Sequence, residues 1–378
     1  IILAHQIIFQ DFFPNKNLLL GHDYASQIPN FIFGKVWFNN NFLSIPWFTP
    51  SFCCGIPFYG DPQSMYYSLQ QLIFLFFSPL MSLKLMFLFF SLISFFGTFL
   101  LLNKSFNKNI YISLIAASIF LFNGFFNFRA VIGHVTFLSY VFIPIYCYLV
   151  ILSFEKNYNK PKSIFYLLIS SIVFANFIHS GSGTIMLPII FSILFVILIY
   201  IYLNEKLKII YNLILSFLIG LIISSSKIYA SLSFLSNFPR EYSPMVFNNF
   251  FDLISVTFKS LFLYPNISKF NSSVIDGVIN KLNVHEIEFG ISIVPLLVFA
   301  IFLVNLKKIR FNKFTLIKII SLIFMFTIII FTAIINISDM ALGSFFQKLP
   351  IVKNNWVNYR FTLVYIIPVV ISSSIFID

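Results

Sequence analysis

The chain has 378 residues, of which 59% are hydrophobic and only 10% charged, and its formal net charge is +12. Soluble domains carry about 25% charged and about 45–50% apolar residues, so we do not expect a water-soluble enzyme. The excess of Lys and Arg lies in short loops between apolar segments. It therefore indicates membrane topology, and no nucleic-acid partner is expected.

Apolar segments long enough to cross a bilayer recur along the chain. They lie near residues 80–102, 110–128, 135–154, 163–178, 184–203, 209–231, 289–306, 314–337 and 360–377. Residues 1–9 read as the tail of an earlier helix. The sequence thus predicts an all-α polytopic membrane protein with about ten transmembrane helices in a single transmembrane domain, 1–378. The first residue is not Met and the last lies in an apolar run, so we expect a fragment of a longer chain.

The distribution of Lys and Arg predicts which loops face the cytoplasm. Basic residues cluster in the short loops 103–109, 155–162, 204–208 and 307–313, which the positive-inside rule places on the cytoplasmic side. The long loops 10–78 and 236–288 then face outward, together with most Asp and Glu residues. Both are rich in aromatic residues, so we expect them to be ordered. The first contains two helical stretches, near 24–38 and 63–77, and the second stretch could lie flat at the membrane interface.

Two acidic residues of the first external loop are candidates for catalysis. Asp23 follows His22 just outside the presumed first helix, where partial desolvation would raise the carboxyl pKa toward the range of a general base. The alternative is that Asp23 caps the helix that follows it. Asp61 precedes Pro62 in a segment rich in Gly and Pro, as a turn residue or as part of a pocket wall.

Several cationic residues lie near the predicted outer boundary of the membrane. Arg129 can bind a phosphate with two parallel hydrogen bonds or extend toward lipid headgroups. His134, after Gly133, is a helix cap or a ligand contact, whereas His179 reads as structural. Lys227, in an apolar helix, faces a cavity or extends to the interface.

Three further charged residues lie later in the chain. Arg240 stands in a Pro-Arg-Glu-Tyr stretch, where it is a surface charge or a ligand contact. Glu288 precedes a predicted membrane helix, where an acid also suits the helix macrodipole. Arg360, beside Tyr359, is typical of an interface anchor. The chain has no Walker A, GxGxxG, GxSxG or HExxH motif.

An ordered set of short motifs resembles the YfhO-like bacterial membrane proteins of the GT-C glycosyltransferase superfamily. The matching stretches are Asp23 with Gln27 and Pro29, Trp47-x-x-Pro50, Gly55-x-Pro57-x-x-x-Asp61-Pro62-Gln63, Arg129…Gly133-His134, Pro239-Arg240-Glu241, Glu288-Phe289-Gly290 and Leu349-Pro350…Arg360-Phe361. They follow the family's order across most of the chain. The resemblance implies a membrane enzyme with a large first external loop.

What this resemblance implies for function is a transfer reaction on the extracytoplasmic face of a bacterial cytoplasmic membrane. A sugar would pass from a polyprenyl-phosphate donor to a glycan, lipid or protein acceptor. Asp23 is carried over as the general base and Asp61 as a second acidic candidate. The substrate contacts carried over are His22, Arg129, His134, Arg240, Glu288 and Arg360. The first loop lacks an Asp-x-Asp pair, so the need for a divalent cation stays open.

Two other classes of function compete with the enzyme. A transporter or flippase of lipids or lipid-linked sugars would need a charged path through the bilayer, and charged residues such as Lys227 and Lys84 are few within the predicted spans. A structural membrane subunit would tolerate substitutions in residues 20–64. Incubation with a labelled lipid-linked sugar distinguishes the three: an enzyme would transfer the sugar covalently, a transporter would only move the lipid across the membrane, and a structural subunit would do neither.

Overall fold

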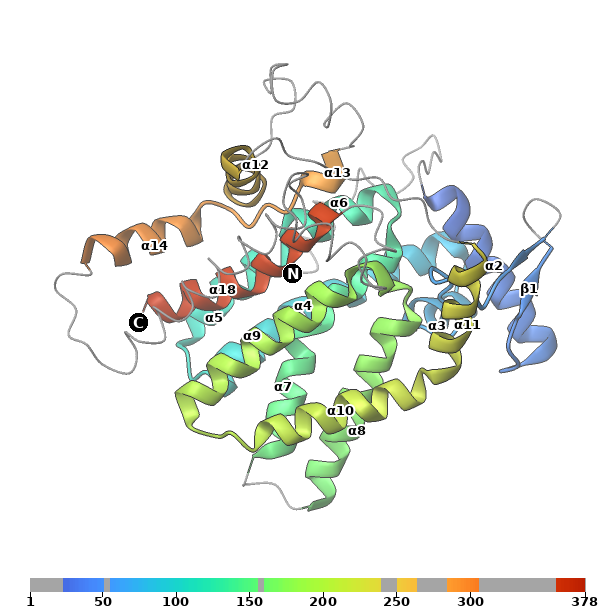
Figure 1. Cartoon of the computed structure of the whole chain (residues 1–378), viewed down its shortest axis with the longest axis horizontal. Helices are drawn as coiled ribbons and strands as arrows, with labels where there is room; N and C mark the ends of the chain where they lie inside the picture. Colours follow the sequence, from blue (N-terminus) through green and yellow to red (C-terminus); the bar gives the residue numbers. More distant parts are fainter. Residues whose placement is uncertain are drawn as a thin grey trace. The chain divides into compact units, whose positions relative to one another are not determined.

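The computed structural model describes residues 23–50, 55–155, 160–238, 250–263, 284–305 and 358–377. This part of the chain is mostly helical, with one small antiparallel hairpin of strands β1 (Phe48–Thr49) and β2 (Ile56–Pro57), in which Phe48 pairs with Pro57 (Figure 1). The chain divides into two compact units. The first comprises 1–97, 128–186 and 208–239, and the second comprises 98–127, 187–207 and 240–378.

Among the residues that the structure describes, six helical segments are long and apolar enough to cross a membrane. They are Pro79–Ser105, Ile110–Ile132, Val135–Phe154, Lys160–His179, Ser182–Asn204 and Tyr359–Phe376. A seventh results if the bent pair Ile209–Ile223 and Ser225–Asn237 counts as one span. These segments confirm the prediction of a helical integral membrane protein. Ten spans and their orientation stay predictions, and residues 1–9 and 314–337 lie outside the described residues.

The membrane helices of the first unit pack through small and polar residues. Helix α8 (Lys160–His179) lies against α7 (Ile143–Phe154) and α10 (Ile209–Ile223) (Figure 1). A Cβ atom on Gly220 of α10 would come within 2.6 Å of the Phe174 ring of α8, so only Gly permits this spacing. Ser216 and Ser170 are joined across the same pair at 2.9 Å, and Tyr146 of α7 donates to Ser216. Such contacts are typical of helix association in lipid.

The predicted segment 209–231 is two helices and not one. Helix α10 ends at Ile223, α11 (Ser225–Asn237) begins at Ser225, and their axes differ by 66°. Ser224, between them, leaves helical geometry, with φ −97° and ψ 6°. Serine side chains compete with the helix for backbone hydrogen bonds, and three successive serines favour a break at this point.

Where the structure describes it, the first long loop contains two helices. Helix α2 (Tyr24–Asn41) covers the expected stretch 24–38. Helix α3 (Leu69–Phe76) is shorter than the predicted 63–77, because the chain turns before it and Ser68 caps its start by accepting from Gln71 N at 3.2 Å. Phe31 of α2 stacks on Phe74 of α3 with ring centroids 4.1 Å apart. The two helices therefore form one packed pair.

Three further elements of the first unit link this pair to the membrane helices. They are most of α4 (Pro79–Leu100), the 3₁₀ helix η2 (Val135–Phe142) and the 3₁₀ turn η3 (Ser182–Ile185). Gln70 of α3 donates to the Val135 carbonyl at 3.4 Å, which connects the α2–α3 pair to the start of η2. Helix α6 (Gly124–Ile132) leads into η2 through a short turn at 133–134.

The second unit is built around a fully buried terminal helix. Helix α18 (Ile366–Phe376), which follows the 3₁₀ helix η7 (Asn358–Tyr365), packs against α5 (Ile110–Leu121) and α14 (Val294–Asn305). The span Tyr359–Phe376 is completely buried, although a lipid-facing interface anchor was one expectation for this region. The remaining described elements are the π-helix η1 (Leu101–Ser105), α9 (Met186–Asn204), α12 (Phe250–Phe262) and α13 (Val284–Ile287).

Helix α14 begins later than the sequence suggested. The predicted span started at residue 289, whereas the helix begins at Val294. Ser292 has a positive φ of 75°, which is incompatible with a continuous helix, and its hydroxyl accepts from Val294 N at 3.4 Å. Residues 288–293 therefore form a connection in which Glu288 is placed outside any helix.

Candidate functional site

Asp23 stands immediately before α2, at the position where a capping residue is expected. Its side chain nevertheless makes no capping hydrogen bond to its own helix. Instead, its carboxylate oxygen Oδ2 lies 2.8 Å from His134 Nε2. The Asp23 side chain is 46% exposed and that of His134 only 13% exposed. Asp23 thus presents an accessible carboxylate whose orientation is fixed by a mostly buried imidazole.

The other nitrogen of the His134 ring is held by a buried arginine. Arg129, in the last turn of α6, places Nη1 2.6 Å from His134 Nδ1 and is fully buried. Its guanidinium also lies over the Phe137 ring, 5.0 Å from the centroid. A guanidinium can only donate, so Nδ1 accepts and the proton of the ring sits on Nε2, from which it is donated to Asp23. The three residues therefore form one directed chain, from Arg129 through His134 to Asp23.

Gly133 allows the backbone before His134 to approach the start of α2, where Asp23 lies. It has φ +82°, a region that side chains rarely adopt, and a Cβ atom on it would lie 2.6 Å from Tyr24 N. The close approach is completed by Asp23 N, which donates to the Ile132 carbonyl at 3.1 Å, and by the Tyr24 hydroxyl, which donates to the Ala130 carbonyl. The Gly133-His134 motif therefore holds Asp23 in place: Gly133 permits the close backbone approach, and His134 binds the carboxylate.

Asp61 has a different set of partners. Its carboxylate accepts from Gln63 N at 2.9 Å, a typical side-chain turn that fits the structural alternative given above. Its backbone carbonyl, with that of Tyr59, accepts from the ammonium of Lys227 at 2.7 and 2.8 Å. Lys227 is buried, and these two carbonyls supply the hydrogen bonds that a charge inside apolar surroundings requires. Asp61 is thus part of a rigid turn seated on α11.

Glu288 and Arg360 belong to the second unit. Arg360 binds Glu286 through two hydrogen bonds, at 2.9 and 2.5 Å, and both side chains are buried. Glu288 was the predicted site residue of this stretch, but the partner of Arg360 is Glu286.

Glu288 itself is a buried carboxyl without a counter-charge among its hydrogen-bond partners. It is 4% exposed, its Oε1 accepts from Gly290 N at 3.1 Å, and its Oε2 has no hydrogen-bond partner among the described residues. Burial raises the pKa of Glu288 to about 7. A Cβ atom on Gly124 would lie 2.6 Å from Oε1, so this carboxyl packs directly against the start of α6.

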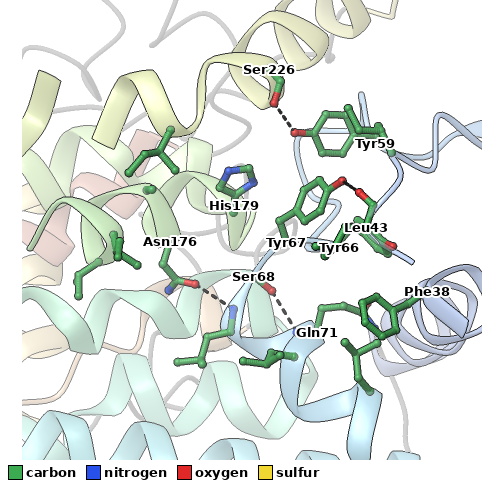
Figure 2. A pocket seen from close by; sticks show the side chains of 18 of the residues that line it. Phe38, Leu43, Tyr59, Tyr66, Tyr67, Ser68, Gln71, Asn176, His179 and Ser226 are labelled. Atoms are coloured by element: carbon green, nitrogen blue, oxygen red, sulfur yellow. Dashed lines mark hydrogen bonds between the residues drawn. The ribbon is translucent and has the colours of Figure 1, made fainter. Parts of the chain in front are cut away.

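A cavity of about 820 Å³ lies in the first unit, among α2, α3, α8 and the α10–α11 break. Figure 2 shows that the Tyr67 and His179 rings and the Tyr59–Ser226 pair face its interior. The Tyr59 and Ser226 hydroxyls are 2.9 Å apart, and the Tyr67 hydroxyl donates to the Leu43 carbonyl at 2.6 Å. Burial raises the pKa of Tyr67 to about 12, so its hydroxyl remains a neutral donor.

This cavity was not predicted from the sequence. None of Asp23, Asp61, Arg129 and His134 lines it. The available signals were the Tyr66-Tyr67 pair before an apolar helix and the position of His179 at the end of a predicted span, and both are equally typical of a protein core.

The remaining predicted contacts lie outside the described residues, because His22 and Arg240 are not among them. Within the described ranges, no group of three or more His, Cys, Asp or Glu side chains is arranged to hold a metal ion. Asp23 and His134 would supply only two such ligands. Comparison of the chain with protein-family models, with curated proteins and with solved structures finds no match.

Proposed function

We propose that this chain is a membrane glycosyltransferase that moves a sugar from a polyprenyl-phosphate donor to an extracytoplasmic acceptor, with Asp23 as the general base. The observation that carries the proposal is the chain of contacts from Arg129 through His134 to an accessible Asp23 carboxylate. The order of the sequence motifs supports the choice of reaction. The helical membrane architecture suits a donor that stays in the bilayer.

In the proposed reaction, an acceptor hydroxyl binds beside Asp23. Its oxygen attacks the anomeric carbon of the donor sugar while the bond between that carbon and the phosphate oxygen breaks. The proton of the hydroxyl passes to the Asp23 carboxylate, and polyprenyl phosphate leaves with the electron pair of the broken bond. Attack from the side opposite the leaving group inverts the anomeric configuration.

His134 and Arg129 are proposed to position the base rather than to touch the substrate. The imidazole donates to one carboxylate oxygen and fixes the plane of the carboxylate, and the buried guanidinium fixes the imidazole. A catalytic group held through its neighbours in this way loses less rotational freedom in the transition state. A direct contact between the Arg129 guanidinium and a donor phosphate would require Arg129 to leave its buried position.

The competing transporter is less well supported. Among the described residues, the lining of the cavity in the first unit includes no Asp, Glu, Lys or Arg. A path for a charged lipid-linked sugar would need such side chains, so we favour the enzyme.

The deciding experiment uses Asp23→Asn and Asp61→Asn as a matched pair. Purified protein in proteoliposomes is supplied with radiolabelled polyprenyl-phosphate sugars and a membrane extract as the source of acceptors, and covalent transfer is measured. Asp23→Asn should lower the rate by about 10²–10⁴-fold, the usual contribution of a general base. Asp61→Asn should retain the rate, because Asn preserves the side-chain oxygen that accepts from Gln63 N.

Full transfer by Asp23→Asn would overturn the proposed role of Asp23. Loss of transfer only in Asp61→Asn would move the base to Asp61. Translocation of the labelled lipid without covalent transfer would identify a transporter.

A further inference from the structure

The cavity of the first unit has a chemical character of its own, distinct from the Asp23 site. Its polar side chains are largely bonded to one another or to the backbone, as in the Tyr59–Ser226 pair and the contact of Tyr67 with the Leu43 carbonyl. Asn176 likewise accepts from Leu69 N at 3.0 Å (Figure 2). What remains facing the interior is mainly ring and aliphatic surface, which favours an apolar occupant.

The size of the cavity suits a long hydrocarbon chain. Its volume of about 820 Å³ lies within the range of pockets that hold ligands of several hundred daltons. The lining residues that the structure describes include no Asp, Glu, Lys or Arg. A phosphate or a sugar would meet no charged side chain on this described part of the walls, whereas a chain of methylene groups gains from every contact with them.

The cavity reaches the exposed apolar faces of α8 and α10, which would face lipid if these helices span a membrane. Helix α8 is the least buried of the six candidate spans, at 28%. Its exposed face includes Leu168 and Ile172, and the exposed face of α10 includes Ile222 and Ile223. Ile172 and Ile223 belong both to these exposed faces and to the cavity lining. An occupant can therefore enter sideways from the bilayer without crossing water.

We infer that this cavity binds an acyl chain of a bilayer phospholipid. Bilayer phospholipids surround the exposed faces of α8 and α10 at very high local concentration, and the uncharged lining gives a rare phosphorylated lipid no advantage over them. This lipid site is separate from the proposed transfer reaction, because its lining does not include Asp23, His134 or Arg129.

The test uses photo-crosslinking. The purified chain is placed in vesicles of phosphatidylglycerol and phosphatidylethanolamine that include a phospholipid with a diazirine in the middle of one acyl chain. After irradiation, labelled peptides are identified by mass spectrometry. We expect enriched labelling of residues 66–76 and 172–176, which come from two walls of the cavity, over other exposed segments of the same helices.

Two variants fill the cavity from opposite walls, Val173→Trp on α8 and Leu72→Trp on α3. Both positions line the cavity. Each displaced methylene group of the bound acyl chain lowers the affinity about fourfold. We expect each Trp to displace about one to two methylene groups, so the cavity labelling should fall about tenfold. Leu168→Trp is the matched control on α8: this residue is exposed and outside the lining, so the labelling should be retained.

Each outcome has a defined meaning, and none depends on transferase activity. Uniform labelling of all exposed helices, unchanged in both filled variants, overturns the inference. So does displacement of the probe by polyprenyl phosphate at a concentration equal to that of the protein, which would assign the cavity to the donor. Gel filtration and thermal unfolding show whether each variant is folded. Because the two substitutions lie on separate helices, one variant can still test the inference if the other does not fold.

Discussion

Replacing Gly133 by Ala should separate Asp23 from His134 without touching either side chain. The backbone at this position has φ +82°, and an L-residue held in the left-handed region costs about 1–2 kcal/mol. The added Cβ would also lie 2.6 Å from Tyr24 N and 2.8 Å from the Tyr24 ring, well inside ordinary contact. The start of α2 must therefore shift, and Asp23 directly precedes it.

The size of this shift sets the expected effect. Ordinary contact begins near 3.4 Å, so the backbone must move by several tenths of an ångström. The 2.8 Å contact between Asp23 and His134 then lengthens beyond good hydrogen-bond distance. A misplacement of about 1 Å costs about 100-fold in rate, so we expect a loss of that order in sugar transfer. The free energy of unfolding should fall by about 1–3 kcal/mol.

Gly183→Ala is the matched control for this experiment. Gly183 lies in the same unit, has no positive φ, and a Cβ on it meets no atom within 4 Å. Its unfolding free energy should stay within about 0.5 kcal/mol of the parent. Transfer is measured with labelled donor, and stability is measured by thermal unfolding in detergent. Parent-like transfer by Gly133→Ala, at the expected loss of stability, would refute the reasoning that the docked geometry of Asp23 matters.

Three further predictions concern Arg129 and the buried charges of the second unit. Arg129→Met should lower the turnover number about 10–100-fold with little change in KM for the donor, and Arg129→Lys should restore part of it; a rise in KM alone would indicate direct donor binding instead. Because burial raises the pKa of Glu288 to about 7, unfolding should cost about 3 kcal/mol less at pH 8 than at pH 4, and Glu288→Gln should flatten this pH profile of thermal unfolding. Glu286→Gln should destabilise the chain by about 3–5 kcal/mol by leaving Arg360 uncompensated, and combining it with Arg360→Met should recover much of that loss; additive losses would contradict the pairing.

The sign of the Glu288 effect follows from its environment. The folded chain holds the proton more tightly than the unfolded chain, so stability is greatest below the ordinary carboxyl pKa and is lost as the pH rises toward and past 7. The usual carboxylate, paired with a cation, would give the opposite slope. A parent protein that gains stability between pH 5 and pH 8 through Glu288 would show that this carboxyl has found a cation.

The membrane helices could be predicted from the sequence because their cause is local. A segment that crosses lipid must satisfy its backbone internally and be apolar over its whole length, and both demands are visible in a run of residues. The span Val135–Phe154 matches the predicted 135–154, and the start of α5 at Ile110 follows Asn109, which caps it by accepting from Tyr111 N.

The site could be predicted only in part, because its contacts depend on the tertiary structure. Asp23, Arg129 and His134 were each recognisable as candidates, but their connection depends on the backbone turn at Gly133. Burial also redirected side chains: Arg129, expected at the membrane boundary to meet a phosphate or a headgroup, is enclosed and bound to His134.

The second unit gives a parallel case. Glu286 and Glu288 stand two residues apart before a predicted helix, and nothing in the sequence indicates which of them meets Arg360. In the structure, Glu286 lies in the short helix α13 and its carboxylate binds Arg360, whereas Glu288 follows that helix in the connection to α14.

The seat of Lys227 has a mechanical consequence. Its ammonium fastens the turn at 59–61 to α11, while the 66° bend at Ser224 leaves α11 joined to α10 by a single non-helical residue. A rotation of α11 about Ser224 would therefore move the turn at 59–61, which includes Tyr59, together with the helix. Because Tyr59 lines the cavity of the first unit, such a movement of α11 would also move this part of the cavity wall.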